Sequence, residues 1–579
     1  MAIADQKQQQ QMLEITVDGR VFQVQSGQSL LSALREVSIE VPTLCHRKDL
    51  FPAGACRLCV VEVKGSRNLV ASCIQPVSEG MVVYTQSARV RQARRVVLEL
   101  TLANHPDDCL YCLRNSNCEL RQLAAQYDAK RRFRGKKRRA TTDATSLSLV
   151  RDPEKCILCQ RCVSVCNDVQ AIGAISPLKR GFDTTIGVAF GDGLGDSECV
   201  NCGQCARVCP TGALIERDDT ALVYEALADP SLAVVAQVAP AVRLSLAQEF
   251  GMKSGDNIAG KLVAGLKLLG FNKVFDTNFT ADLTIMEEAA EFVTRLKNGG
   301  PFPLVTSCCP AWIKYAEQYY PDKVNHLSSC KSPQMMMGAI LHSNYAEEMQ
   351  AVQGKRFVVS IMPCTAKKWE RAEVTPGDVD AVITTRELVR MLKRESIDLA
   401  KLAPVAFDKV FGDSSGAAII FGASGGVAEA AVRTAYWMVT GEEMDNPDLT
   451  PARGLQGVKT TKVDVAGTSI NVAVLSGLSN VKEFFAKGGW ENYHLIEVMA
   501  CPGGCINGGG QPYNEDWPLE QLVSSIYRID KNMPRRRSHE NPEIIALYKR
   551  YLERPNSHEA HRLLHREYKD RSSVFNPTV

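Results

Sequence analysis

The chain has no stretch of apolar residues long enough to cross a membrane. A membrane-spanning helix needs about 18 to 20 consecutive, mainly apolar residues. The most apolar window of the 579 residues, 416–432, is rich in glycine and contains Ser424 and Glu429. The first residues, a short polar segment followed by glutamines, also lack the apolar stretch of a secretory signal. These two absences predict a soluble, cytoplasmic protein that does not bind membranes.

The chain also has almost no excess of either charge sign. Its 68 Lys and Arg residues and 65 Asp and Glu residues leave a formal net charge of +3, which is too small to indicate nucleic-acid binding by the chain as a whole. No glycine-rich dinucleotide fingerprint stands between an expected strand and an expected helix, so nicotinamide chemistry would need a partner protein. The length alone predicts roughly four domains of ordinary size.

Cysteine, in contrast, is abundant. The 21 cysteines fall in groups at 45–73, 109–118, 156–166, 199–209, 308–309 and 501–505, with Cys330 and Cys364 alone. In a long chain without a secretory signal, thiols stay reduced, and clustered cysteines bind metal more often than they form disulfides. The grouping therefore predicts several metal centres.

Residues 1–86 are expected to form a domain that holds a [2Fe–2S] cluster. Alternating residues at 13–17 and 21–24 flank Asp18-Gly19, which predicts a β-hairpin, and a helical pattern starts at Ser29. Hairpin, helix and cysteine loop together resemble a β-grasp ferredoxin. A set of four thiolates with one C-x2-C pair suits a [2Fe–2S] cluster, and a structural zinc site is the alternative. The expected ligands are Cys45, Cys56, Cys59 and Cys73.

Residues 87–140 carry an unusual ligand set after a helix expected over 87–102. His105, Cys109, Cys112 and Cys118 have spacings of three, two and five residues. This set resembles the [4Fe–4S] module with one histidine and three cysteine ligands that complex I contains, and a zinc knuckle is the alternative. The basic run at 130–139, with eight Lys and Arg residues in ten, predicts a solvated or flexible linker. Docking of an acidic redox partner is the second interpretation, and nucleic-acid binding is the third and does not suit the other motifs.

Residues 141–220 contain two runs of the form C-x2-C-x2-C-x3-C, the second followed by Pro210. This pattern is typical of a bacterial two-cluster ferredoxin, in which the fourth cysteine of each run binds the other cluster. One [4Fe–4S] cluster is then expected on Cys156, Cys159, Cys162 and Cys209, and the other on Cys199, Cys202, Cys205 and Cys166.

Residues 221–579 alternate apolar runs with helical patterns. The runs at 232–236, 357–362, 381–384 and 472–475 predict buried strands, and residues 245–250, 262–269 and 287–296 predict helices. This alternation predicts an α/β domain with parallel sheets flanked by helices. Ala239 and Cys364 follow directly after two of the runs, where open α/β sheets bind their ligands. The charged tail after about residue 518 is expected to be helical, to lie on the surface and to carry no chemistry.

Three segments of this last domain share a pattern. They are Thr306-Ser307-Cys308-Cys309-Pro310-Ala311-Trp312, Met362-Pro363-Cys364-Thr365-Ala366-Lys367-Lys368, and Glu497-Val498-Met499-Ala500-Cys501-Pro502-Gly503-Gly504-Cys505. They resemble the three signature motifs of the [FeFe]-hydrogenases, and the accessory cysteine groups match the large members of that family in order and spacing. The resemblance implies a multi-domain α+β and α/β protein whose catalytic domain at 221–579 has two lobes.

The resemblance also implies an H-cluster, in which a [4Fe–4S] cubane is joined through a cysteine sulfur to a diiron unit with CO, cyanide and a bridging dithiolate. The implied cubane ligands are Cys309, Cys364, Cys501 and Cys505, with Cys505 as the bridge. The implied wall of the diiron pocket consists of Ala239, Pro240, Pro333, Gln334, Met362, Lys367 and Met499. Outside these motifs, lone methionines are more often ordinary core residues.

Nineteen of the 21 cysteines are then ligands, and Cys308 and Cys330 remain. Cys330 is expected to be a small buried hydrophobe. The family resemblance gives Cys308 a role in proton transfer and extends the path through Glu288, Ser328 and Glu291 to Arg295 at its exit. Without the resemblance, Glu288 and Glu291 would indicate a solvated helix face.

The sequence therefore predicts a [FeFe]-hydrogenase that interconverts H2 with protons and electrons and exchanges the electrons with ferredoxin or a similar acidic carrier. The implied cofactors are one [2Fe–2S] cluster, three accessory [4Fe–4S] clusters and the H-cluster, whose diiron unit maturation proteins must build. A complex I-like electron-transfer subunit is an alternative that leaves the three C-terminal motifs unexplained. A hydrogen sensor or a hydrogenase-like assembly protein is another, although such proteins tend to lose the relay cysteine that is present here.

Overall fold

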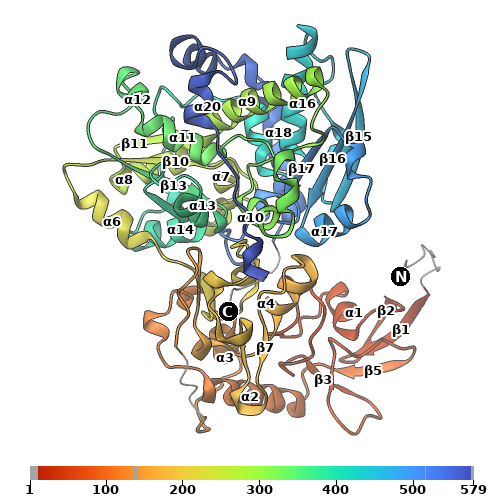
Figure 1. Cartoon of the computed structure of the whole chain (residues 1–579). Helices are drawn as coiled ribbons and strands as arrows, with labels where there is room; N and C mark the ends of the chain where they lie inside the picture. The colour runs from red at the N-terminus through yellow and green to blue at the C-terminus, as the bar shows by residue number, and fades with distance from the viewer. Residues whose placement is uncertain (1–10, 136–140, 515–516, 576–579) are drawn as a thin grey trace.

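The computed structural model describes residues 11–135, 141–514 and 517–575. Figure 1 shows two parts joined by a narrower junction, with the N-terminal modules below and the α/β domain above. Each part is built around its own sheets, and the signature motifs lie in the upper part.

The first module is a five-stranded sheet in the order β2-β1-β5-β3-β4. Strands β1 (Met12–Val17) and β2 (Arg20–Gln25) form the expected hairpin, and β1 pairs in parallel with β5 (Met81–Tyr84). Strands β3 (Val60–Val63) and β4 (Val70–Ala71) complete the sheet. Helix α1 (Leu30–Glu36) begins after Ser29, whose hydroxyl accepts a hydrogen bond from the Ser32 amide. The hairpin and helix predictions are confirmed.

The two following modules are small and rich in turns. Helix α2 (Ala88–Asn104) confirms the helix expected there, and α3 (Glu119–Gln126) follows the cysteine loop. Strands β6 (Leu149–Arg151) and β9 (Leu214–Glu216) pair in an antiparallel manner around α4 (Arg161–Ser164) and α5 (Gln204–Val208). A second hairpin joins β7 (Ser176–Leu178) and β8 (Thr185–Gly187). Of the basic run, residues 136–139 lie outside the described residues.

The upper part contains two four-stranded sheets. The first, in the order β11-β10-β13-β14, is entirely parallel and consists of β10 (Ala233–Val238), β11 (Lys273–Asp276), β13 (Arg356–Met362) and β14 (Ala381–Thr384). The second, in the order β12-β17-β16-β15, consists of β12 (Leu304–Val305), β17 (Leu495–Met499), β16 (Thr468–Ser476) and β15 (Val458–Val465). Only β15 in this sheet is antiparallel. The predicted parallel sheets are confirmed.

Helices cover both sheets and fill the space between them (Figure 1). Helix α9 (Thr277–Asn298) is buried over most of its length and packs against α11 (Pro333–His342) and α16 (Gly426–Thr440). It contains the helix expected over 287–296 but begins ten residues earlier. The helix expected over 245–250 is instead a short α7 (Val242–Ser245) followed by a 3-10 turn (Ala247–Phe250).

The remaining helices before the tail are α6 (Thr220–Ala228), α8 (Ala259–Leu268), α10 (Pro310–Tyr319), α12 (Asn344–Glu348), α13 (Ala366–Glu373), α14 (Thr385–Arg394), α15 (Gly416–Ile419) and α17 (Leu478–Ala486). The predicted helix over 262–269 corresponds to α8. In the part of the chain that the structure describes, no helix has the length and hydropathy to cross a membrane.

The C-terminal tail departs from its expected place on the surface. Helix α18 (Leu519–Asn532) buries Leu522 and Ile526 in the hydrophobic core that α9 and α16 share. Helices α19 (Pro542–Leu547) and α20 (His558–Leu564) bury apolar side chains against α9 and α11. The sequence predicted that the tail forms helices, but it did not show which surface these helices cover. They cover helices of the catalytic domain and complete its hydrophobic core.

Candidate active site and cluster-binding sites

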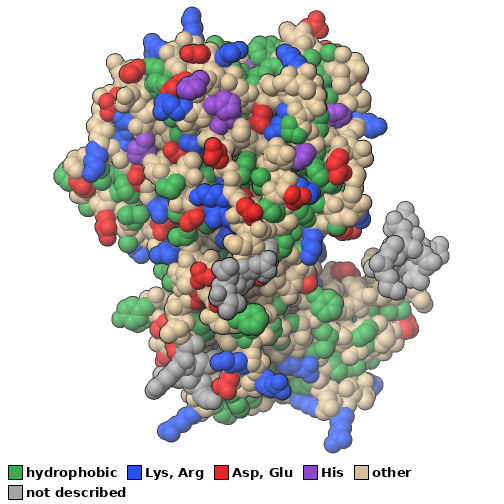
Figure 2. All heavy atoms as spheres, viewed as in Figure 1, with side chains coloured by type: hydrophobic (Ala, Val, Ile, Leu, Met, Phe, Trp, Pro, Cys, Tyr) green, Lys and Arg blue, Asp and Glu red, His purple; other side chains and the backbone are tan. Residues whose placement is uncertain are grey.

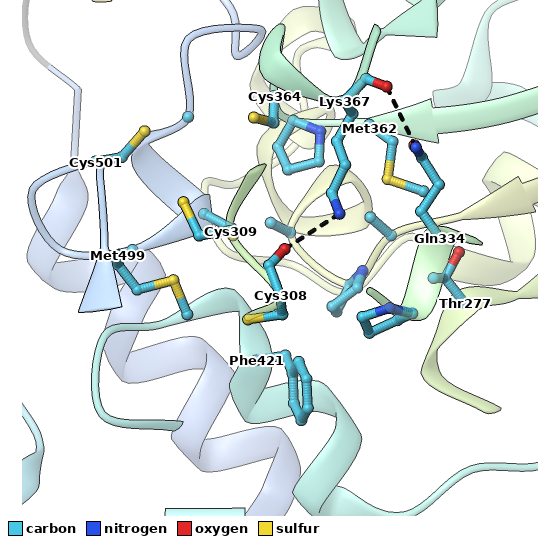
Figure 3. Close-up of a pocket in the computed structure, with 18 of the residues that line it drawn as sticks. Thr277, Cys308, Cys309, Gln334, Met362, Cys364, Lys367, Phe421, Met499 and Cys501 are labelled. Carbon is cyan, nitrogen blue, oxygen red and sulfur yellow. Dashed lines mark hydrogen bonds between the residues drawn. The ribbon is translucent and has the colours of Figure 1, made fainter. Parts of the chain in front are cut away.

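The three motif segments meet at one cavity of about 80 Å³. Cys309 directly precedes α10, Cys364 follows β13, and Cys501 and Cys505 follow β17. Strands β12, β13 and β17 are parallel members of the two sheets, so the loops after them converge where the sheets face each other. All four thiols line the cavity, and Figure 3 shows Cys309, Cys364 and Cys501 around it. Segments almost two hundred residues apart thus form a single set of four sulfur donors.

The rest of the wall contains every residue that the sequence assigned to the diiron pocket. Ala239 and Pro240 lie beyond β10, Pro333 and Gln334 begin α11, and Met362, Lys367 and Met499 complete the set. Cys308 also lines the cavity. Sequence reasoning missed six further wall residues that lie outside the three motifs or are glycine, namely Ala241, Thr277, Ala281, Phe421, Gly504 and Gly508.

Lys367 is the charged group of this cavity wall. Its ammonium donates hydrogen bonds to Glu370 Oε2 at 2.9 Å and to the Cys308 carbonyl at 3.2 Å. Burial opposes the charge, but the Glu370 carboxylate outweighs this and raises the pKa of Lys367 above its usual value. Gln334 Nε2 donates to Glu370 Oε2 at 3.1 Å, while the buried Oε1 of Gln334 has no protein partner. The wall therefore presents one fixed cation and one unsatisfied amide oxygen.

The chemistry of the four thiols suits a cluster. Burial raises the pKa of Cys309, Cys364 and Cys505, and it raises the pKa of Cys501 to about 11. Thiols in such a place keep their protons unless metal cations replace them, because four thiolates would otherwise repel each other in a medium of low polarity. The Ala500 amide donates to Cys309 Sγ at 3.4 Å, a type of bond that stabilises a thiolate ligand. A cubane with four cysteine ligands fits these residues.

Behind Cys308, three acidic and hydroxyl side chains continue away from the cavity. Burial and the Glu291 charge raise the pKa of Glu288 to about 8, and the charge of Glu288 is among the causes that raise the pKa of the Cys308 thiol. Ser328 Oγ donates to Glu291 Oε2 at 3.2 Å, and Arg295 Nη2 donates to Glu291 Oε1 at 2.6 Å. Glu288 is buried rather than on a solvated face, and its Oε2 has no protein partner.

The tail contributes a histidine to this network that sequence reasoning missed. His565 Nδ1 lies 2.8 Å from Ser329 Oγ, and Ser329 donates to Glu291 Oε2 through both its amide and its hydroxyl. The other ring nitrogen of His565 lies 3.1 Å from Glu287 Oε2, and the Tyr548 hydroxyl donates to the same carboxylate. The tail, which was expected to carry no chemistry, thus places His565 beside a residue that contacts Glu291.

The eight ferredoxin-type cysteines line two further cavities, four in each, in the crossed arrangement that the sequence predicted. One is lined by Cys156, Cys159, Cys162 and Cys209, and the other by Cys166, Cys199, Cys202 and Cys205. Each cavity thus collects three cysteines of one run and the fourth of the other. Burial raises the pKa of Cys159, Cys162, Cys202 and Cys205, as in the larger cavity.

The four N-terminal cysteines also lie together. Hydrogen bonds from Cys56 and Cys73 lower the pKa of Cys45, and a hydrogen bond from Cys73 lowers that of Cys59. The Cys56 amide donates to Cys45 Sγ at 3.5 Å. This mutual contact suits a small cluster with four thiolate ligands.

The histidine module is the most exposed of the cysteine groups. Cys109 is exposed, and Leu110 and Tyr111 next to it are 87 % and 88 % exposed. Burial lowers the pKa of His105 to about 4, and its Nδ1 has no protein partner, which leaves a neutral imidazole with a free ring nitrogen. Arg131, from the basic run, donates to the carbonyls of Leu102, His105 and Pro106 at 2.9, 2.8 and 2.8 Å. The first part of the basic run is therefore bound to the loop that contains His105.

Comparison with known protein families agrees with this geometry. Residues 232–509 match the iron only hydrogenase large subunit, C-terminal domain, and 519–571 match the iron hydrogenase small subunit. Upstream, residues 10–88 match a 2Fe-2S iron-sulfur cluster binding domain, 94–132 the NADH-ubiquinone oxidoreductase-G iron-sulfur binding region, and 155–213 a 4Fe-4S dicluster domain. Iron–sulfur modules thus precede a hydrogenase catalytic domain.

Individual relatives lead to the same family. The chain is 46 % identical to the NADP-reducing hydrogenase subunit HndD of Solidesulfovibrio fructosivorans, over 96 % of this chain and 99 % of that one. It is 38 % identical to iron hydrogenase 1 of Clostridium pasteurianum, over 96 % of this chain and all of that one. A solved structure of a variant of [FeFe]-hydrogenase HydA1 from Chlamydomonas reinhardtii matches over 61 % of this chain and 99 % of that one, with 37 % identity and a TM-score of 0.54.

The chain belongs to the [FeFe]-hydrogenases. It is an enzyme of this family with an H-cluster domain and with accessory iron–sulfur domains that transfer electrons, as the sequence predicted.

Proposed function

We propose that this chain catalyses the reversible interconversion of H2 with protons and electrons, and that it exchanges the electrons with ferredoxin. The observation that carries the proposal is the single buried cavity that collects Cys309, Cys364, Cys501, Cys505 and Lys367. Four soft sulfur donors and one cation, surrounded by Met362, Met499 and small apolar residues, suit a cluster with an anionic ligand shell.

In this proposal Cys309, Cys364, Cys501 and Cys505 would hold the cubane, and Cys505 would also link it to the diiron unit. When bound, the H-cluster supplies the site where H2 is formed or split and the redox steps that this needs. Lys367 would offer a charge-assisted hydrogen bond to a cyanide ligand, and Ala239, Pro240, Pro333 and Gln334 would enclose the remainder of the unit. Met362 and Met499 supply soft, polarisable packing and keep water out.

Protons move between the cavity and the surface along side chains of this chain. Cys308 receives or delivers a proton at its Sγ, Glu288 exchanges it at a carboxylate oxygen, and Ser328 passes it on to Glu291 beside Arg295. Support comes from the 3.2 Å bond between Ser328 and Glu291 and from the pKa of Glu288, about 8, because a carboxyl group with that pKa takes up and releases protons near neutral pH.

One [2Fe–2S] cluster and three accessory [4Fe–4S] clusters would carry the electrons. We assign the [2Fe–2S] cluster to residues 1–86, the cluster of His105, Cys109, Cys112 and Cys118 to 87–140, and the remaining two to 141–220. The catalytic domain occupies 221–579. A neutral imidazole in place of a thiolate changes the charge of the second cluster and hence its potential.

The exposed histidine module is our candidate docking face for the carrier. Leu110 and Tyr111 give it an apolar tip, and Lys and Arg side chains gather around α2 at the lower edge of the molecule (Figure 2). An acidic ferredoxin of small size fits this combination of an apolar tip and surrounding cations. The apoprotein must also meet the maturation proteins that build the diiron unit.

Two other functions fit part of the same features. Cytosolic iron-sulfur assembly component 3 of Bos taurus is 31 % identical over 64 % of this chain and 83 % of that protein, so an assembly or sensing role is one of them. The presence of Cys308 in the cavity wall and of Glu288 and Glu291 behind it favours the enzyme. The name of HndD describes a subunit, so the second alternative is an electron-transferring component of a larger complex.

Uptake of H2 with an artificial acceptor, measured on purified protein whose infrared spectrum shows bound CO and cyanide, tests the proposal. We expect uptake by the chain alone. Protein that carries these bands but neither consumes nor forms H2 would favour the sensing or assembly role, and activity that appears only with added subunits would favour the complex.

A further inference from the structure

A side chain of the accessory ferredoxin module reaches into the catalytic domain and contacts a cysteine of the H-cluster site. Gln204 lies between Cys202 and Cys205 and begins α5. Its amide Nε2 donates to Cys501 Sγ at 3.2 Å and to the Asn507 carbonyl at 2.9 Å. Gln204 is 4 % exposed, so both bonds are shielded from water. One amide group therefore joins the loop of one proposed cluster to a ligand of another.

The surrounding junction holds this amide in place. Thr365, next to Cys364, donates through Oγ1 to the Asn201 carbonyl at 2.7 Å. A Cβ on Gly509 would collide with the Cys202 carbonyl, and a Cβ on Gly203 would collide with Thr365. The two parts thus approach closely at the residues just before Gln204, through backbone at Gly509 and through the Thr365 side chain at Gly203.

A neighbouring residue also binds the segment that contains Asn507, but it makes no hydrogen bond to a sulfur among the described residues. Arg207, three residues further along α5, donates through Nη1 to the Asn507 carbonyl at 3.1 Å. In the part of the chain that the structure describes, no hydrogen bond joins Arg207 to Cys501, although the charge of Arg207 acts to lower the pKa of that thiol. Arg207 and Gln204 therefore share a role in joining the two parts, and of the two only Gln204 donates a hydrogen bond to the sulfur.

We infer that Gln204 is a positioning residue that raises the reduction potential of the catalytic cubane through its N–H···S bond to Cys501, and so lets the accessory module tune the catalytic site. The inference rests on the proposed assignment of Cys501 as a cubane ligand. Reduction adds negative charge to the cluster and its sulfurs, so a fixed N–H donor stabilises the reduced cluster more than the oxidised one. Since the donor belongs to another module, the potential depends on the contact between the two parts.

The test compares Gln204→Met and Gln204→Glu with Arg207→Lys in the full chain loaded with its clusters. Methionine keeps the length without a donor, and glutamate keeps the shape but replaces the donor with an oxygen. Arg207→Lys alters the hydrogen bonding to Asn507 and keeps the positive charge. The readout is the midpoint potential of the cubane, followed by electron paramagnetic resonance during a redox titration.

We expect both Gln204 variants to lower the ratio of reduced to oxidised cubane about tenfold at a fixed potential, which for one electron is a midpoint shift of about 59 mV to more negative values. Arg207→Lys should leave the midpoint near that of the unmodified protein. Equal shifts in all three variants would mean that Gln204 only joins the two parts, and an unchanged midpoint in both Gln204 variants would refute the inference.

A second measurement needs no variant. In the reduced protein labelled with ¹⁵N in the glutamine amide groups, pulsed electron paramagnetic resonance should detect a hyperfine coupling between one amide nitrogen and the cubane, and a missing coupling would refute the inference even if the variants fail to fold. A failure of the proposed function would look different: the protein would show the cubane signal and the Gln204 coupling but would not turn over H2.

Discussion

His565 Nδ1 lies 2.8 Å from Ser329 Oγ, and the Ser329 amide donates to Glu291 Oε2 at 3.1 Å. The imidazole thus fixes the outer glutamate of the proposed proton path from a segment that begins more than two hundred residues later. His561, one helical turn before it, stacks on the ring at a centroid distance of 3.9 Å but is exposed.

The first prediction follows from this pair. His565→Ala removes the partner of Ser329 and loosens Glu291, and a single hydrogen bond of this kind contributes about 0.5–1.5 kcal/mol. We expect H2 turnover to fall roughly three- to tenfold if that energy is lost in positioning the path, with unchanged iron content. His561→Ala is the matched control and should retain near-normal turnover. If the two variants lose H2 turnover to the same extent, both histidines contribute only through packing.

The second prediction concerns Cys308. A thiol donates and accepts protons, whereas alanine does neither, so Cys308→Ala should keep the infrared bands of CO and cyanide but lose most H2 turnover. Cys308→Asp, another proton carrier of similar size, should retain more activity than alanine. Cys330→Ala is the control because Cys330 is a buried core residue outside the cavity wall. Loss of the cluster in Cys308→Ala, or normal turnover, would overturn the relay assignment.

The third prediction concerns the cubane ligands. Cys364→Ala removes one of the four sulfur donors that line the cavity, and an iron of the cubane then lacks its anionic ligand. The protein should lose the H-cluster signals while the signals of the accessory clusters persist, because their cysteines line separate cavities. Iron analysis together with electron paramagnetic resonance measures both. Full iron content with normal H2 uptake would contradict this ligand assignment.

The fourth prediction concerns pH. Burial and the nearby charge of Glu291 raise the pKa of Glu288 to about 8. Removing a like charge lowers the pKa of an acid, so Glu291→Gln should move the ionisation of Glu288 to lower pH. The carboxyl stretching band of protonated Glu288, followed by infrared spectroscopy against pH and identified by its absence in Glu288→Gln, reports the midpoint. A midpoint that stays near pH 8 in Glu291→Gln would mean that burial alone sets it.

The fifth prediction concerns the basic run. Replacing Lys130, Arg134, Lys136 and Lys137 by glutamine should slow turnover with ferredoxin and weaken its dependence on salt, because these cations attract an acidic carrier. Turnover with a small neutral dye should be unchanged. Arg131 is kept, since it holds the His105 loop through three carbonyls. If neither rate changes, the run serves only as a linker.

The sequence was most informative where ligands are close together in the chain. The spacing of Cys156 to Cys166 and of Cys199 to Cys209 predicted a crossed arrangement, and the two cavities contain these sets. The strands that precede Ala239 and Cys364 were also predictable, because a parallel strand buried on both faces is a continuous apolar run.

The sequence could not predict contacts between distant segments when the contacting residues belong to no recognisable motif. Gln204 and Cys501 are 297 residues apart, and a glutamine between two cysteines carries no pattern that points to a third. Thr277 and Phe421 line the cavity because of how α9 and the turn at 420–422 pack. His565 was hidden for another reason: an amphipathic helix shows which of its faces is apolar, but not which carboxylate its final residues will meet.

The close approach of Gly509 to the Cys202 carbonyl has a consequence for modularity. Ferredoxin-type modules are often regarded as interchangeable parts, yet here the accessory module and the catalytic domain touch through backbone with no space for a side chain. A foreign two-cluster ferredoxin grafted onto the catalytic domain would have to supply glycine at position 203 and a main chain of the same course beside it. The position of the cysteine loop at 199–205 relative to the catalytic domain is therefore fixed at this junction by main-chain contact.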